Sequence, residues 1–264
     1  MIRSRGMALA LLIGVTCVLT LVAVAYASPG GQSGGRPAPA SRMDGMVTRL
    51  WELQVDPAQI DAFRAIGVEN TDASVRLEPG VLMMHAVQLA GAPAQARVLE
   101  VYASQDAYEA HLRTPHFLAY KAAAGRMVRS QRLVPVNPIA LCAKGGTVAP
   151  GAARKAMVRI AVIGVDPAQL EAYKSLLAEE QEASVRLESG VLMLHSVQYA
   201  EDPSQVRLLE VYASPEAYAS HIRTRHFLKY KLRTASMVRS LELLPANPVM
   251  LAAKAGPAGR PACM

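Results

Sequence analysis

The run Ala73-Ser-Val-Arg-Leu-Glu78 occurs a second time, 110 residues later, as Ala183-Ser-Val-Arg-Leu-Glu188. The match extends in both directions. Residues 46–138 align with residues 156–248 without a gap, and 49 of the 93 aligned pairs are identical. Solenoid repeats are at most about 50 residues long, so this longer period indicates two copies of a small domain. We therefore expect a fused pair whose function was built on a two-fold assembly.

Both copies predict the same order of elements. In the first copy, residues 47–55 have the composition of a strand, and Asp56-Pro57 then caps the first turn of a helix with a proline that is tolerated there. We expect this helix to end near Pro79-Gly80, and its counterpart near Ser189-Gly190, with glycine as the left-handed cap. The remaining predicted elements are a β-hairpin over residues 81–89 and 97–103, a second helix capped by Ser104, and a final strand over Leu133–Asn137.

The resulting order β-α-β-β-α-β is that of the ferredoxin-like split unit. Its antiparallel sheet has helices on one face only, so the other face is apolar and needs cover. Two such sheets cover each other either by stacking face to face or by wrapping into one barrel.

The first 27 residues have the pattern of an export signal. Arg3 and Arg5 precede an apolar run over residues 7–25, and Ala25-Tyr26-Ala27 offers a cleavage site. Because a run of 19 residues is also long enough to cross a bilayer, an uncleaved membrane anchor is the alternative. Residues 28–45, rich in Gly, Pro and Ser, are expected to be a flexible linker. We expect an exported protein, periplasmic or extracellular, that is either processed or tethered by residues 7–25.

The net charge of +7 does not predict nucleic-acid binding, because Arg and Lys alternate with Glu and Asp inside the copies and no basic cluster contains interleaved aromatic residues. Beyond the N-terminal segment, the cysteines are Cys142 and Cys263, and neither has a Cys or His at metal-ligand spacing. A disulfide between them is one possibility in an oxidising compartment, but two inert thiols are the favoured interpretation.

The segment from Leu99 to Lys121 resembles the antibiotic biosynthesis monooxygenase family, and most closely its quinol monooxygenase branch. Three motifs carry the resemblance: Glu78-Pro-Gly80-Val81, Glu100-Val-Tyr102 and His111-x-x-Thr114-Pro-His116-Phe117. Both copies contain them. The second copy departs from the family pattern at Ser189 and Arg225, where the family has proline.

The resemblance implies an α+β fold in which two tandem ferredoxin-like domains, residues 46–145 and 156–255, form a dimeric α+β barrel within one chain, followed by a tail at 256–264. It implies a cofactor-free monooxygenase that acts on a small quinol or phenol, so the expected partner is a small aromatic or quinone-like molecule and no cofactor is expected. A monomer is expected because the pair is already fused. The alternative is a non-catalytic small-molecule-binding or structural module.

Glu100 is the first candidate for chemistry. It alternates with Val98 and Tyr102, so these three side chains are expected on one face of the sheet. A buried carboxyl group there would have a raised pKa and would serve as a base, whereas the alternative is a glutamate that only holds a neighbouring helix.

The six histidines form three pairs between the copies. His85 is expected on an apolar strand face with Val81, Met83 and Val87, either as a general base or bonded to a backbone carbonyl. His111 and His116 are five residues apart and are not expected to share a helix face, which argues against a zinc site. One of them is expected to cap or staple a break at Thr114-Pro115, and the other to point into the pocket. The predicted catalytic residues are Glu100, His116 and His85 with their copies Glu210, His226 and His195; the predicted pocket residues are His111, His221, Tyr102, Tyr212 and Trp51; no metal ligand is predicted.

Trp51 corresponds to Ala161 in the second copy. If this position lines a cavity, the indole fills space that Ala161 leaves open, and the two pockets are expected to be unequal. The alternative is that Trp51 packs under a helix and the pockets are alike.

Overall fold

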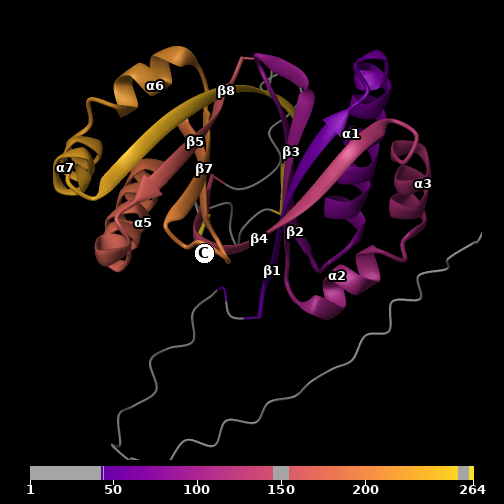
Figure 1. Cartoon of the computed structure of the whole chain (residues 1–264), viewed down its shortest axis with the longest axis horizontal. Coiled ribbons are helices and arrows are strands. Elements are labelled where there is room, and N and C mark those ends of the chain that lie inside the picture. Colours follow the sequence, from indigo (N-terminus) through magenta and orange to yellow (C-terminus); the bar gives the residue numbers. More distant parts are fainter. Residues whose placement is uncertain (1–42, 44, 145–154, 255–261) are drawn as a thin grey trace, which may run out of the picture. The chain divides into compact units, whose positions relative to one another are not determined.

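The computed structural model describes residues 43, 45–144, 155–254 and 262–264, whose helices and strands are drawn in Figure 1. The predicted export signal at residues 1–27 and almost all of the predicted linker lie outside the described residues, and so does most of the tail. None of the helices in the described part of the chain has the length and apolar character needed to cross a membrane.

Each copy has the order β-α-β-β-α-β, with the second helical region divided in two. The first copy contains β1 (Val47–Val55), α1 (Ile60–Leu77), β2 (Val81–Leu89), β3 (Ala92–Tyr102), α2 (Gln105–His111), α3 (Pro115–Ala124) and β4 (Val128–Ala143). The second contains β5 (Met157–Val165), α5 (Leu170–Leu187), β6 (Val191–Tyr199), β7 (Gln205–Tyr212), α6 (Pro215–His221), α7 (Arg225–Thr234) and β8 (Val238–Ala253), and a short β9 (Ala262–Cys263) follows. The predicted α+β class and the tandem ferredoxin-like units are confirmed.

The predicted caps at the starts of the helices are also confirmed. The Asp56 carboxylate accepts a hydrogen bond from the backbone N–H of Ala58 in a short 3-10 turn (Pro57–Gln59) that leads into α1, and the Ser104 hydroxyl accepts one from that of Ala107 in α2. These bonds satisfy N–H groups that have no partner within the helix.

The predicted glycine caps at the ends of the first helices are wrong. Helix α1 ends at Leu77 with Glu78 in an extended conformation, and among the described glycines only Gly45 has a positive φ. Gly80 is needed for a different reason, since a Cβ atom at this position would overlap the Cβ of Ala107 in α2. The same holds for Gly190 and Ala217 in the second copy.

Strands β4 and β8 close the sheet into a barrel. The first half of β4 pairs with β1 of its own copy and the second half pairs with β6 of the other copy, and β8 likewise joins β5 to β2. The result is a closed ring of eight strands in the order β1-β3-β2-β8-β5-β7-β6-β4, with every pairing antiparallel. The final strand of each copy is therefore much longer than the strand predicted over residues 133–137 of the first copy.

The helices lie outside this ring, with α1, α2 and α3 on one side and α5, α6 and α7 on the other (Figure 1). Because strand directions alternate around eight strands, β1 and β5 run the same way. Equivalent residues of the two copies therefore lie at the same end of the barrel, and the pseudo-two-fold axis runs along it. The copies also contact each other at helix ends: Lys144 donates to the carbonyl of Val185 in α5, and Lys254 to that of Val75 in α1.

A register shift in β2 corrects one prediction. Val81 pairs with Tyr102 while Met83 pairs with Val101, so an extra residue reverses which face the following side chains occupy. Val81 packs with Met84 and Tyr102 beneath the helices, whereas His85 points into the barrel. The expectation that Val81 and His85 share a face is wrong.

Cys142 and Cys263 form a disulfide that joins β4 to β9. The preference for two inert thiols is therefore wrong. The reason is non-local, because β9 pairs with the end of β4 and brings together two residues 121 positions apart.

We expect Gly80→Ala to destabilise the protein by about 1–3 kcal/mol, because the new methyl group would push α2 away from the start of β2. Urea denaturation would measure the change. Gly91→Ala is the matched control, since a Cβ at Gly91 meets no atom within 4 Å. Equal effects of the two substitutions would contradict the packing argument.

Candidate functional site

A cavity of about 440 Å³ lies between the sheet and the helices of the first copy. We call it the helix-side pocket. Its wall contains Trp51 from β1, Glu100 and Tyr102 from β3, and an aromatic lid from α2 and α3. Residues on alternate positions of β1 and β3 face it, which confirms the prediction that Val98, Glu100 and Tyr102 share one face.

Glu100 is the acidic residue on this wall. Its Oε2 accepts hydrogen bonds from the Trp51 indole at 3.2 Å and from the Tyr102 hydroxyl at 3.0 Å. Burial raises the pKa of Glu100 to about 7, against the lowering effect of these two bonds and of the nearby Arg49 charge. A carboxyl group with this pKa exchanges a proton near neutral pH, as a general base requires.

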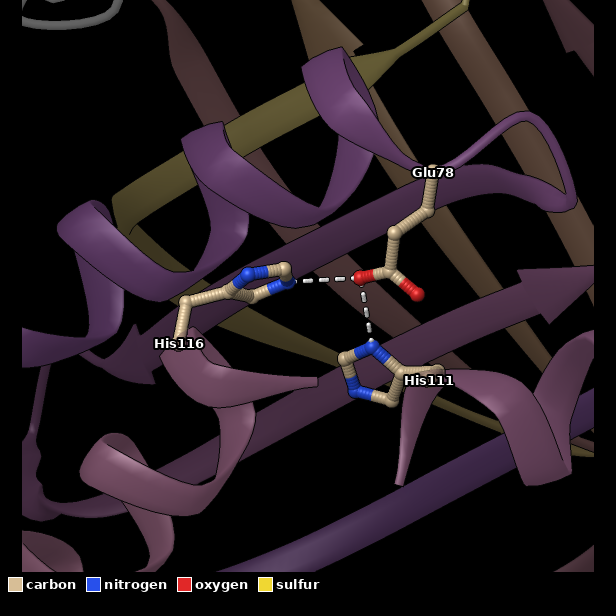
Figure 2. Close-up of side chains that lie close together, drawn as sticks. All are labelled: Glu78, His111 and His116. Carbon is tan, nitrogen blue, oxygen red and sulfur yellow. Dashed lines mark hydrogen bonds and ion pairs between the residues drawn. The ribbon is translucent and has the colours of Figure 1, made fainter. Parts of the chain in front are cut away.

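His111 reaches the same pocket from the end of α2. Figure 2 shows that His111 and His116 both point toward the side chain of Glu78, which follows α1. The Oε1 atom of Glu78 is 2.9 Å from His111 Nδ1 and 2.7 Å from His116 Nε2. Burial lowers the pKa of His111, and the bond to Glu78 partly offsets that effect.

This arrangement corrects an inference from spacing. His111 and His116 were not expected to share a face, but the chain breaks between α2 and α3, and Thr114 caps α3 by accepting from the backbone N–H of Phe117. The break turns both imidazoles toward one carboxylate. The second copy repeats the arrangement with Glu188, His221 and His226.

Each Glu-His-His group has the residue types of a metal site, with one ligand atom from each residue within 4.8 Å of the others. The two contacts of Glu78 have hydrogen-bond lengths, and both imidazoles share one oxygen atom. The group therefore also fastens the end of α1 to the α2–α3 corner as a plain hydrogen-bond network.

The structure divides the predicted catalytic and pocket residues of the first copy among three places. Glu100, Tyr102, Trp51 and His111 line the helix-side pocket. His116 binds Glu78 and is not part of the pocket wall, and His85 lies on the opposite face of the sheet. Glu100 and His116 thus do not converge on this cavity, and their catalytic roles stay predictions.

The equivalent region of the second copy is organised differently. Arg159 donates to Glu210 at 2.6 Å, and Tyr212 also donates to Glu210. Ala161 is buried in an apolar cluster with Tyr173 and Leu177, both fully buried. Leu177 replaces Gly67 of the first copy.

The two copies are therefore unequal, but not in the expected direction. The prediction is that the Trp51 indole fills space that Ala161 leaves open. Instead the indole forms a wall of an open pocket, and larger side chains from α5 pack against Ala161.

Sequence reasoning missed three groups of the site. Arg49 and its copy Arg159 share the face of Glu100 and Glu210, and period-two alternation along β1 and β5 was the signal for them. Tyr108, which lies under the Arg49 guanidinium at 4.7 Å, carries no such signal. Glu180 lies 3.6 Å from His221, and burial raises its pKa to about 7.

The family model of antibiotic biosynthesis monooxygenase matches residues 46–123 and 156–232. A candidate monooxygenase from Lactobacillus acidophilus NCFM has a similar structure, with a TM-score of 0.75 and 19% identity over 80% of this chain and 98% of that one. A second candidate monooxygenase, from Fusobacterium nucleatum, gives a TM-score of 0.68 and 16% identity over 80% of this chain and 96% of the other. A candidate antibiotic biosynthesis monooxygenase from Bacteroides thetaiotaomicron is 48% identical over 39% of this chain and 99% of its own, with a TM-score of 0.38.

No curated protein matches the chain. The first two structures support the observed fold, and the family match supports a general monooxygenase-like function.

Glu100→Gln is expected to stabilise the protein at pH 8 and to have little effect at pH 4.5. The pKa of Glu100 is raised in the folded state from 4.5 to about 7, so its ionisation opposes folding progressively as pH rises through this window. The gain is up to about 3 kcal/mol at ~1.4 kcal/mol per pKa unit. Urea denaturation at both pH values measures it.

Glu210→Gln is the matched comparison and should have the opposite sign. It leaves the buried guanidinium of Arg159 without its carboxylate, which costs about 3–5 kcal/mol. Destabilisation by both substitutions at pH 8 would refute the distinction between the two copies.

Proposed function

Because the chain belongs to the antibiotic biosynthesis monooxygenase family, we propose that it is an exported, cofactor-independent monooxygenase that oxidises a small quinol in the helix-side pocket. The single observation that carries this proposal is Glu100, a carboxyl group with a pKa near neutrality on the wall of a cavity of about 440 Å³. The cavity size and its aromatic wall suit a one-ring or two-ring phenolic compound.

In the proposed reaction, ionised Glu100 accepts the proton of one hydroxyl group of the quinol. The resulting anion is electron-rich at a ring carbon, which forms a bond to one atom of dioxygen. The O–O bond then breaks, one oxygen atom stays on the ring, and the other leaves as water. The quinol itself supplies all the electrons, so that quinol and dioxygen give a hydroxyquinone and water.

The pocket supports each part of this sequence. Tyr102 and Trp51 hold the Glu100 carboxyl group in a fixed orientation, and Arg49 adds a positive charge nearby that favours an anion. The aromatic lid excludes water from the reactive anion. His111, oriented by Glu78, is the second titratable group on the wall and is available for later proton transfers.

Export is supported by two features. The N-terminal segment has the pattern of a signal or anchor, and the Cys142–Cys263 disulfide is typical of proteins in oxidising compartments.

Glu100→Gln is expected to lower the rate of quinol-dependent oxygen uptake by about 100-fold or more, the usual contribution of a general base. An oxygen electrode measures this rate after subtraction of quinol autoxidation in buffer. For the unmodified protein, kcat/KM should rise with pH through about 7, because the base must be ionised. Glu180→Gln is the control, since Glu180 has a similarly raised pKa of about 7 but lies in the other copy. Uptake no faster than autoxidation, or equal in the Glu100→Gln protein, would disprove the proposal.

A further inference from the structure

A second cavity, of about 310 Å³, lies inside the barrel between the two copies. We call it the barrel cavity. It is on the opposite face of the sheet from the helix-side pocket, and its wall contains residues from both copies. Most of that wall is aliphatic, from residues such as Leu50, Leu99, Ile160 and Leu209.

His85 and His195 lie within this cavity, one from each copy. Their rings are stacked with centroids 5.1 Å apart and planes 9° from parallel, and each residue is only 1% exposed. None of their four ring nitrogens has a hydrogen-bond partner of normal geometry among the described residues. Burial lowers the pKa of both imidazoles, to about 4 for His195, so both are neutral at pH 7. Each therefore offers one unused donor and one unused acceptor.

Unpaired buried polar groups cost about 1–3 kcal/mol each, so their presence at equivalent positions of both copies calls for a partner that the protein itself does not supply. The cavity is lined around them by apolar side chains. The missing partner is thus a small molecule, or water, at the floor of the barrel cavity.

The charged residues of the barrel cavity lie one layer above the histidines. Strand register places His195 beside Leu209, and Arg207 is two residues along the same strand from Leu209. Two residues along a strand correspond to about 7 Å. Arg132 has a side chain that is 64% exposed, so this layer is the mouth of the cavity and the histidines form its floor.

The positive charges at the mouth are not equally available. Glu52 lies 3.5 Å from Arg97 and accepts from Arg132 at 2.7 Å, so both copy-one guanidinium groups contact this one carboxylate. In the second copy Val162 replaces Glu52. Arg207 has no carboxylate within 4 Å among the described residues, and it stacks on the Tyr199 ring at 4.4 Å. The Arg207 guanidinium, which also donates to the carbonyl of Val206, therefore faces the cavity without a carboxylate partner among the described residues.

We propose that the barrel cavity binds a small aromatic carboxylate with a hydroxyl group at the far end of its ring, with the carboxylate on Arg207 and the hydroxyl at the edges of the stacked His85 and His195 rings. The hydroxyl donates to one imidazole and accepts from the other, which satisfies two of the unpaired nitrogens. The aliphatic wall contacts the ring. The site does not rest on the proposed oxygenase activity, because it shares no residue with the helix-side pocket.

Isothermal titration calorimetry of the full protein with 4-hydroxybenzoate tests the proposal. We expect one site per chain, with weaker binding of benzoate, which lacks the hydroxyl, and of 4-hydroxybenzamide, which lacks the charge. The sole tryptophan, Trp51, lies on the wall of the helix-side pocket, so its fluorescence should not follow the same saturation curve. A matching fluorescence titration would place the ligand in the other pocket and overturn the proposal.

Arg207→Met should weaken binding by about tenfold or more, as expected for the loss of a charged hydrogen bond. Arg97→Met is the matched control, because the Arg97 guanidinium already contacts the Glu52 carboxylate, and it should change the Kd by less than about threefold.

Replacing both histidines by phenylalanine should remove the preference for 4-hydroxybenzoate over benzoate. Equal losses in the two arginine variants, or no heat with any ligand because the cavity holds only water, would overturn the proposal. Binding that persists in Glu100→Gln separates this site from the oxygenase proposal.

Discussion

The exchange of β4 and β8 between the two copies is the constraint on which the rest of the structure depends. Each strand is 16 residues long and pairs half with its own copy and half with the other. A single copy would expose unpaired strand edges and one apolar sheet face, both of which favour association. The exchange removes both exposures at once, since it closes the ring and turns the two apolar faces toward each other.

Closure of the barrel also places the helix-side pocket and the barrel cavity on opposite faces of the same sheet. Side chains alternate along a strand, so Glu100 faces the helices while its neighbours Leu99 and Val101 face the barrel. The register shift in β2 fixes which side His85 occupies. The same few strands thus supply a titratable carboxyl group to one cavity and two neutral imidazoles to the other.

Sequence differences between the two copies change the residues that line these cavities more than they change the shared fold. The Glu-His-His group is the same in both, and it fastens the end of the long helix to the next helical corner. Around it, Arg159 binds the second carboxylate directly, whereas Trp51 and Tyr102 hold Glu100 without a cation in contact. One copy has a carboxyl group with a raised pKa and the other a buried ion pair, an asymmetry that two identical subunits would not have. Tyr173 and Leu177 complete the difference by occupying the space beside Ala161.

The sequence by itself determined the repeat, the order of elements, the helix caps at Asp56 and Ser104 and the face shared by Glu100 and Tyr102. These depend on local periodicity and on side chains that bond to the next few residues. Only the tertiary structure decided the length of β4, the Cys142–Cys263 bond and the separation of His85 from Glu100. Each of these depends on pairing between residues far apart in the chain or on one extra residue in a strand, and neither leaves a mark in local composition. The meeting of His111 and His116 at Glu78 belongs to the same class, since the break between α2 and α3 brings together two residues that the spacing of one continuous helix would keep apart.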